Sequence, residues 1–156
     1  MKIEFTMGNI ITDINDIKIL LVEDNKEELS LKNSLKEFSS RVNTELFIFE
    51  DEKKLIDFLN EHRNDKKPTD LYCTIIFFNC HDELCNAIDT IKKIKLDASF
   101  KTIPIFVISP SIDRNDIKEV YSSYANAYIV KPEDLKGLVA ILDKFKNFWN
   151  LAQLPK

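Results

Sequence analysis

The sequence predicts an α/β fold, a doubly wound parallel sheet of five strands in the order 2-1-3-4-5 with helices on both faces. The main observation is an uninterrupted apolar run at 75–78 that stops at the polar Asn79. The run is short and rich in β-branched and aromatic residues, which indicates a strand buried on both faces rather than a helix. Strand-like and helix-like segments also alternate five times along the chain, and right-handed crossovers favour this strand order.

The predicted strands are short apolar segments. They lie at 17–22, 45–49, the run that ends at 79, 103–109 and 127–130. The second segment has charged neighbours, which favours a place at the edge of the sheet.

The predicted helices follow these strands and carry apolar residues three and four positions apart. They begin after Asn25 and extend over 51–63, 83–96, 113–121 and from 134 towards the C-terminus. Asp24 and Asn25 can cap the exposed amides of the first helix. The lysines at the end of 83–96 are favourable for the helix dipole.

Length and composition predict one domain. The chain has 156 residues, of which 44% are hydrophobic, and this is enough for a single well-formed core. We expect an N-terminal extension at 1–16, the domain at 17–150 and a short tail at 151–156. Because the sequence shows neither a secretory signal nor an apolar run of the roughly 20 residues that span a bilayer, we expect a cytoplasmic protein.

Composition also argues against several classes of function. The formal net charge of −4 gives no support to nucleic-acid binding through a basic surface. With only two glycines, the chain cannot form a glycine-rich phosphate loop. The three cysteines suit reduced thiols, and a zinc site is disfavoured because Cys73, Cys80, His81 and Cys85 do not have the spacing of a compact zinc site.

Polar residues follow four of the five predicted strands, where each strand ends. They are Glu23 and Asp24, Asn79, Ser109 and Lys131. Because the carboxyl ends of parallel strands meet at one edge of the sheet, these side chains are expected to converge there. Two carboxylates, an amide, a hydroxyl and an ammonium group at one edge indicate a site rather than chance polar positions.

This arrangement resembles the receiver domain of two-component response regulators, which has a flavodoxin-like fold. The resemblance covers 17–149, and its motifs are LVEDN at 21–25, the strand ending at 79, TIPIFVIS at 102–109 and AYIVKP at 127–132. The ending KNFWNLAQLP is similar to a stand-alone receiver subfamily that lacks an output domain and is known from partners of phytochrome-type kinases.

The resemblance implies roles for the residues at the sheet edge. Glu23 and Asp24 match the acidic pair that holds Mg²⁺, and Asn79 occupies the position of the aspartate that accepts a phosphoryl group from a kinase histidine. Ser109 and Lys131 match the residues that contact the phosphate.

The resemblance also implies that Tyr128 is the aromatic residue that reports the switch, and that Pro132 follows a cis peptide bond after Lys131. Receivers commonly dimerise through their fourth and fifth helices and last strand. The apolar surface of the helix from 134 is wide enough to favour such a homodimer. We expect a sensor histidine kinase or another signalling protein as partner, and neither nucleic acid nor membrane.

The chain departs from the family at the acceptor position. Asn79 is an amide without an ionised oxygen, so it cannot form the acyl phosphate, and the loss of one negative charge weakens a Mg²⁺ site. Further departures are Glu83, Asn86-Ala87, Pro110 and Tyr124. Tyr124 stands where glycine usually ends the fourth helix, a position that favours positive φ. We interpret the chain as a pseudo-receiver that acts by phosphorylation-independent protein contact, without catalytic residues, an obligatory cofactor or enzyme activity.

Two other interpretations stay open. The chain could be a working response regulator that binds phosphate and Mg²⁺ noncovalently or uses another acceptor, of which Asp82 is the nearest acid. A flavodoxin-like ligand-binding protein or enzyme is disfavoured, because the acids after the first strand would repel a phosphate.

Each site residue also has a structural interpretation. The acidic pair could cap a helix, Lys131 could form a structural salt bridge and Ser109 could bond to the backbone. Tyr128 could fill space beside the fourth helix, and we expect His81 to be an exposed loop residue.

Overall fold

The described chain forms one five-stranded parallel sheet with the order β2-β1-β3-β4-β5, which confirms the predicted topology. This computed structural model describes residues 18–23, 33, 36–37, 45–64, 74–81, 84–133, 140–141 and 144. The strands are β1 Lys18–Glu23, β2 Glu45–Phe49, β3 Thr74–Asn79, β4 Ile105–Ser109 and β5 Ala127–Val130. β2, the segment with charged neighbours, lies at the edge of the sheet, as expected.

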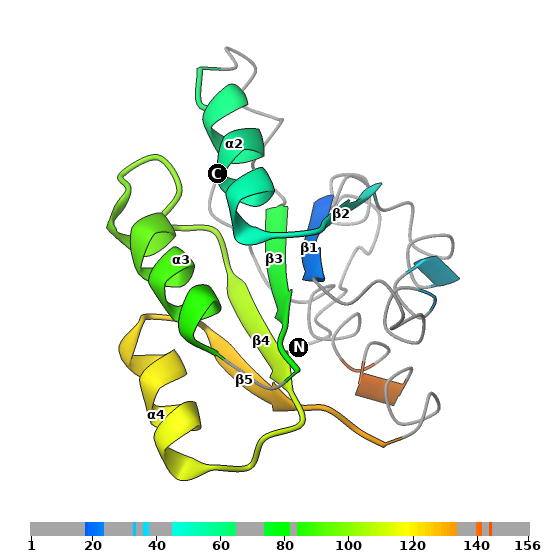
Figure 1. Cartoon of the computed structure of the whole chain (residues 1–156). Coiled ribbons are helices and arrows are strands. Elements are labelled where there is room, and N and C mark those ends of the chain that lie inside the picture. Colours follow the sequence, from blue (N-terminus) through cyan, green and yellow to red (C-terminus); the bar gives the residue numbers. More distant parts are fainter. Residues whose placement is uncertain are drawn as a thin grey trace, which may run out of the picture.

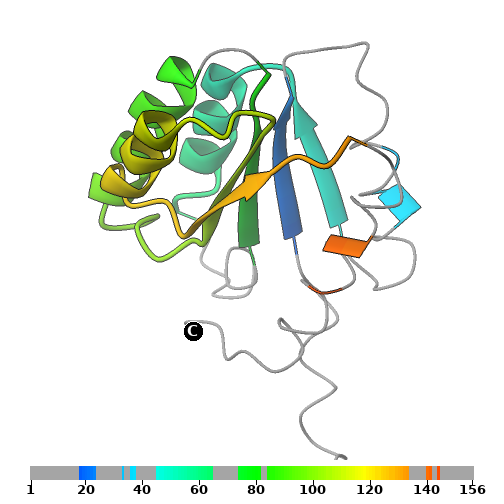
Figure 2. The same cartoon turned by 90° about the horizontal axis from the view of Figure 1, so that it is seen from below.

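Three helices cover one face of this sheet (Figures 1 and 2). They are α2 Glu52–Glu61, α3 Cys85–Leu96 and α4 Arg114–Ser122. Two of them begin at an aspartate: the Asp51 carboxylate accepts the Lys54 N–H at 2.8 Å, and the Asp113 carboxylate accepts the Asn115 N–H at 2.7 Å. The predicted bounds of these helices differ from the observed ones by one or two residues, as is usual at helix ends.

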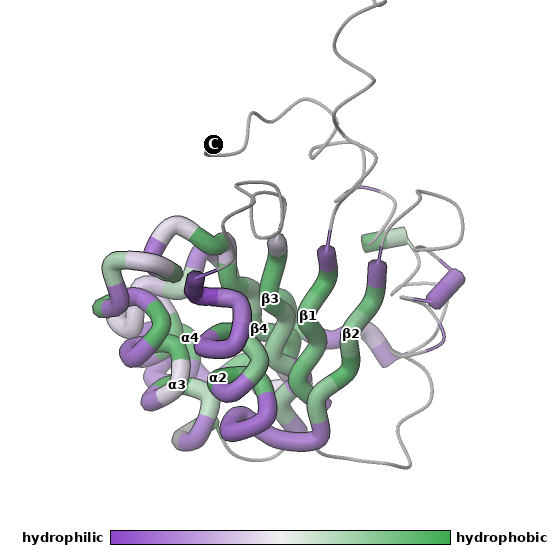
Figure 3. Tube along the Cα trace, turned by 90° about the horizontal axis from the view of Figure 1, so that it is seen from above, coloured by the Kyte–Doolittle hydropathy of each residue, from purple (hydrophilic) through white to green (hydrophobic). Residues whose placement is uncertain are grey.

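The core lies between the sheet and these helices. β3 is buried along its whole length, and the apolar character of the central strands is visible as green tube in Figure 3. Leu55 and Leu59 of α2, Ile91 of α3 and Val120 of α4 are completely buried against it. The helices therefore fix the sheet through apolar contact, which is the main favourable term in folding.

The end of α4 confirms the expectation for Tyr124. This residue has φ 70, in the left-handed region that glycine adopts most readily. The Tyr124 N–H donates to the Tyr121 carbonyl and the Ala125 N–H donates to the Val120 carbonyl, which is the hydrogen-bond pattern of a Schellman motif. The chain thus keeps the turn and carries a bulky residue at its strained position.

Other predictions lie outside the described residues. These are the N-terminal extension, the helix after Asn25, the side chains of the last helix and the C-terminal tail. In the described part, no helix is long and apolar enough to cross a membrane.

Candidate functional site

Glu23, Asn79 and His81 form a polar cluster at the carboxyl end of the sheet, here called the edge cluster. The Asn79 amide nitrogen donates to Glu23 Oε2, and His81 Nε2 lies 2.8 Å from Glu23 Oε1. Glu23 is 1% exposed and Asn79 is 5% exposed, whereas the His81 side chain is 21% exposed. A buried carboxylate therefore holds an amide on one oxygen and an imidazole on the other.

The strand register builds this cluster. β1 and β3 run parallel, and Glu23 and Asn79 are their last paired residues. The chain then continues past Asn79, and the Cys80 N–H donates to the Ile108 carbonyl of β4 at 2.8 Å. This bond holds the backbone beyond β3 against the sheet, so His81 stays at the edge beside Glu23.

Lys131 lies in the same electrostatic environment. Burial lowers the pKa of its ammonium group below the ordinary value of 10.5, and attraction to the Glu23 carboxylate opposes this effect. Its backbone N–H donates to the Ser109 carbonyl at 2.8 Å, which fixes the chain after β5 beside the end of β4. The structure thus places Lys131 where its charge interacts with Glu23.

One polar atom of the edge cluster is unsatisfied. Asn79 Oδ1 is buried and has no hydrogen-bond partner among the residues that the structure describes. Buried carbonyl oxygens are nearly always hydrogen-bonded, because an unpartnered one costs roughly 1–3 kcal/mol. The amide of Asn79 is therefore half satisfied, by Glu23 alone.

Ser109 and Tyr128 both bond to the loop between β4 and α4. The buried Ser109 Oγ accepts the Ser111 N–H at 3.2 Å, and the Tyr128 hydroxyl donates to the Ser111 carbonyl at 2.8 Å. The Tyr128 N–H donates to the Tyr121 hydroxyl at 3.3 Å. Both side chains thus hold this loop in place, and Tyr128 also packs against the core.

Two sequence predictions about this edge are wrong. The described peptide bonds include no cis bond, so the bond before Pro132 is trans. The trans form of such a bond is favoured by roughly 0.5–1 kcal/mol unless the surroundings select the cis form. His81 is partly buried against Glu23 instead of standing in an exposed loop. Its position two residues beyond a central strand was the signal that could have placed it.

The donor set at this edge suits some metal ions better than others. Mg²⁺ prefers an octahedron of oxygen ligands, whereas the edge cluster offers a carboxylate, an amide and an imidazole. In the described part of the chain, no three His, Cys, Asp or Glu side chains come together as a metal site. Asp24 lies outside the described residues. The described residues therefore fit Mg²⁺ poorly.

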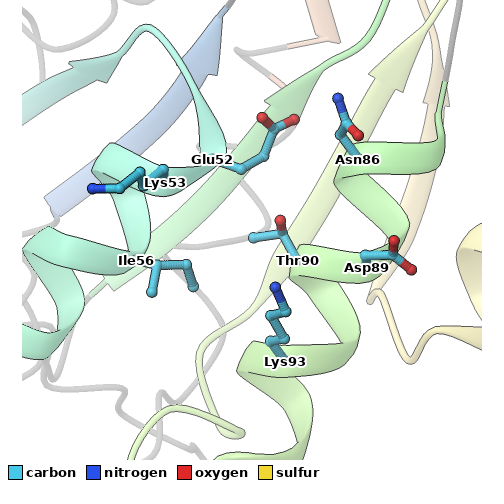
Figure 4. A pocket seen from close by; sticks show the side chains of 7 residues that line it. All are labelled: Glu52, Lys53, Ile56, Asn86, Asp89, Thr90 and Lys93. Atoms are coloured by element: carbon cyan, nitrogen blue, oxygen red, sulfur yellow. The ribbon is translucent and has the colours of Figure 1, made fainter.

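A second feature is a groove of about 360 Å³ between α2 and α3 (Figure 4). Its lining combines two acids, two lysines, one amide, one hydroxyl and one apolar residue, namely Glu52, Lys53, Ile56, Asn86, Asp89, Thr90 and Lys93. Because the charges are mixed and Lys53 is paired with Asp57 at 2.8 Å, the groove favours no particular class of ligand.

No protein family model matches this chain. Among curated proteins, it is 27% identical over 134 residues to the response regulator Rcp1 of Synechocystis sp., covering 84% of this chain and 87% of that protein. It is 23% identical over 145 residues to the probable methanogenesis regulatory protein FilR2 of Methanothrix harundinacea, covering 91% and 89%.

Solved structures give the same result. The phosphorylated cyanobacterial phytochrome response regulator RcpA has a TM-score of 0.72 and 29% identity, over 90% of this chain and 99% of that one. The Mn²⁺-bound form of Rcp1 has a TM-score of 0.68 and 27% identity, with the same coverage. The homologues and structural neighbours of this chain are response regulators, which confirms the resemblance found in the sequence.

Proposed function

We propose that this receiver-like chain of two-component signalling is a pseudo-receiver, which transmits a signal by protein–protein contact without phosphorylation at Asn79. The observation that carries the proposal is the amide at the end of β3, buried and bonded to Glu23. A phosphoryl acceptor must attack with an ionised oxygen, and an amide has none. The fold itself is then the signal, presented to a sensor histidine kinase or another signalling protein.

The proposal covers residues 17–150 as the receiver-like domain, acting in the cytoplasm. The similarity to a phytochrome response regulator supports a sensor kinase as the class of partner. The Mn²⁺-bound form of Rcp1 supports divalent-metal binding as a property to test in this chain, whereas the amide of Asn79 weakens any Mg²⁺ site here.

We further propose a homodimer through α4, β5 and the predicted last helix. Four of the five large exposed apolar side chains in the described part of the chain lie in or beside α4 and β5. They are Ile112, Tyr121, Tyr124 and Val130. Burying such side chains against a second copy would remove apolar surface from water, which favours association.

The test of the pseudo-receiver is intact-mass analysis after incubation with acetyl phosphate and Mg²⁺. We expect the wild type to keep its mass and the Asn79→Asp variant to gain one phosphoryl group, because the variant restores the missing carboxylate. Asn86→Asp, which adds a carboxylate at an exposed position of α3, is the matched control and should stay unmodified. A wild type that gains a phosphoryl group would show that another residue is the acceptor.

The dimer is tested by sedimentation velocity. Tyr124→Asp introduces a charge into the proposed interface and should shift the protein towards the monomer. Leu96→Asp makes the same kind of change at a still more exposed residue at the end of α3, and it should leave the association unchanged. Equal behaviour of the two variants would contradict this interface.

A further inference from the structure

We propose that Asn79 is a latent deamidation site, which the native sheet protects and which becomes a phosphoryl acceptor only after β3 has opened. Deamidation replaces the side-chain NH₂ by OH and leaves an aspartate, the residue type of the receiver family at this position. The proposal rests on the pseudo-receiver function, because the amide of Asn79 defines the silent state. It adds what preserves that amide in the folded chain.

Deamidation of an asparagine uses the next residue of the chain. The backbone nitrogen of Cys80 attacks the side-chain carbonyl carbon of Asn79, loses its proton and forms a cyclic succinimide. The side-chain nitrogen leaves with a proton as ammonia. Water then opens the ring at either carbonyl and gives an aspartate or an isoaspartate at position 79. The reaction consumes water and releases ammonia, and no oxidant, reductant or cofactor takes part.

The strand pairing directs the two reacting groups towards opposite neighbours of β3. β1 and β4 flank this strand, and Glu23 of β1 and Ile108 of β4 are both paired with Asn79. The Asn79 amide nitrogen donates to Glu23 Oε2. The Cys80 N–H instead donates to the Ile108 carbonyl at 2.8 Å. The side-chain amide is therefore anchored towards β1, while the attacking nitrogen is directed towards β4.

The backbone and the burial of Asn79 also oppose ring closure. Asn79 is the last residue of β3, and an extended parallel strand has ψ at about +115°, which must change before the ring can form. This rotation would break the pairing with both neighbouring strands. The side chain is only 5% exposed, so water reaches it poorly. Because β3 lies in the middle of the sheet, we expect it to open only when most of the fold opens.

The unfolded chain has none of these restraints. Cys80 has no branch at Cβ, so its side chain hinders the attack less than that of Val, Ile or Thr would. Each opening of the fold thus exposes Asn79 to an irreversible conversion. A refolded product with an aspartate at this position has the carboxylate that the pseudo-receiver lacks. Unfolding stress would in this way produce a phosphorylatable fraction from the silent protein.

The test is peptide-mass analysis of the full chain after incubation at mildly alkaline pH with and without urea, with fragmentation to assign the modified residue. We expect Asn79 to deamidate at least about 100-fold faster in urea, because a central strand opens only near the free energy of global unfolding. Asn64, exposed in the turn after α2, is the internal control and should react at comparable rates in both samples. Equal rates at Asn79 would overturn the protection. No reaction of Asn79 in urea, while Asn64 reacts, would overturn the latent site.

Cys80→Gly separates protection by the fold from slow chemistry of the Asn79–Cys80 sequence. Glycine removes the hindering side chain and should accelerate deamidation of the chain in urea. The folded variant should stay protected, because the N–H of residue 80 keeps its bond to the Ile108 carbonyl. If the variant has the circular dichroism of the folded wild type and yet reacts as fast as in urea, the sheet is not the protecting element.

The functional consequence is tested with acetyl phosphate on chain that has been incubated in urea and then refolded with Mg²⁺. We expect phosphoryl groups only on molecules in which position 79 has become an aspartate. A deamidated fraction that stays unmodified would overturn the conversion to an acceptor. Phosphorylation of molecules that keep the amide would instead contradict the pseudo-receiver function, so the two failures are distinguishable.

Discussion

Two polar clusters lie at opposite ends of the sheet and differ in how completely they are hydrogen-bonded. The edge cluster lies at the carboxyl end, beside Lys131. The other cluster, here called the amino-end cluster, consists of Lys95 of α3 and Asn126, which precedes β5. Burial lowers the pKa of both lysines, so the two ends have similar components.

The amino-end cluster is well satisfied. Lys95 Nζ donates to the Ile103 carbonyl at 2.7 Å, to the Lys101 carbonyl at 3.2 Å and to Asn126 Oδ1 at 3.1 Å. Asn126 Oδ1 also accepts the Ile105 N–H at 2.9 Å, where β4 begins. The side chains thus complete the backbone bonding at the start of β4, which is a structural role.

The edge cluster leaves Asn79 Oδ1 without a partner, although this atom is buried. Polar groups that only hold a fold together are normally paired, because an unpaired one is costly. The comparison therefore teaches that the side chains of the amino-end cluster complete the hydrogen bonding of the fold, whereas the edge cluster leaves one buried acceptor unpaired. The following substitutions test this difference, beginning with the largest expected effect.

Asn79→Asp should destabilise the metal-free protein by about 2–4 kcal/mol, because it removes the amide donor and places a second carboxylate against buried Glu23. Adding Mg²⁺ should recover much of this loss, since the ion neutralises the two acids. Urea unfolding with and without Mg²⁺ measures both effects. An Asn79→Asp protein that is as stable as the wild type without metal would show that the edge cluster tolerates charge in the same way as a solvated surface.

Asn126→Ala should lower the free energy of unfolding by about 1–3 kcal/mol, because the Ile105 N–H and Lys95 lose an acceptor. Unlike the change at Asn79, this loss should not respond to any divalent ion. Asn115→Ala on the exposed side of α4 is the control, with an expected effect within about 0.5 kcal/mol. If a divalent ion restored the stability of Asn126→Ala, the two clusters would not differ in their response to metal.

The sequence predicted the sheet well, because the signals were local and strong. The buried run into Asn79 and the pattern at 127–130 fixed strands that the structure places at Thr74–Asn79 and Ala127–Val130. The parallel topology predicted that the polar residues after the strands converge at the carboxyl edge of the sheet, and the structure places Glu23 beside Asn79 there. The family position favours positive φ, so Tyr124 was expected either to be strained or to change the turn, and the structure has the positive φ.

The details of the site were less predictable, because they depend on side-chain packing between distant segments. The position of His81 two residues beyond a central strand places it near the sheet edge, but its contact with Glu23, 58 residues earlier in the chain, depends on how distant segments pack. The isomer at Pro132 likewise depends on its surroundings, and the structure has the trans form. The hydrogen-bond partners of Lys95 lie in two other segments. In the sequence this lysine appeared only to favour a helix dipole, whereas in the structure it joins α3 to both segments by hydrogen bonds.

Tyr124→Gly should raise the free energy of unfolding by about 0.5–1 kcal/mol, because glycine adopts positive φ without the strain of a side chain. Tyr124 is 69% exposed, so little packing is lost. Ser122→Gly, within α4, is the control and should be destabilising, because glycine is a poor helix former. If Tyr124→Gly lowers stability in the monomer, the ring has a packing role within the chain, and the turn that leads to Asn126 is then held by more than its backbone bonds.

The smallest effect concerns Asp97, which joins the ends of α2 and α3 on the same side as the amino-end cluster. The guanidinium of Arg63, at 2.6 Å, and the Ser99 N–H hold the pKa of Asp97 below its ordinary value of 3.8.

A carboxyl group whose pKa is lower in the folded state stabilises the fold above its unfolded pKa, and this stabilisation is lost as the pH falls through the folded pKa. Asp97→Asn should therefore lower the urea midpoint slightly near neutral pH, and this difference should disappear as the pH falls through the folded pKa of Asp97. The exposed Asp89→Asn change on α3 should give no such pH-dependent difference. A constant effect of Asp97→Asn at all pH values would mean that packing of Arg63 over the Phe100 ring, at 4.5 Å, holds these helices together without help from the ion pair.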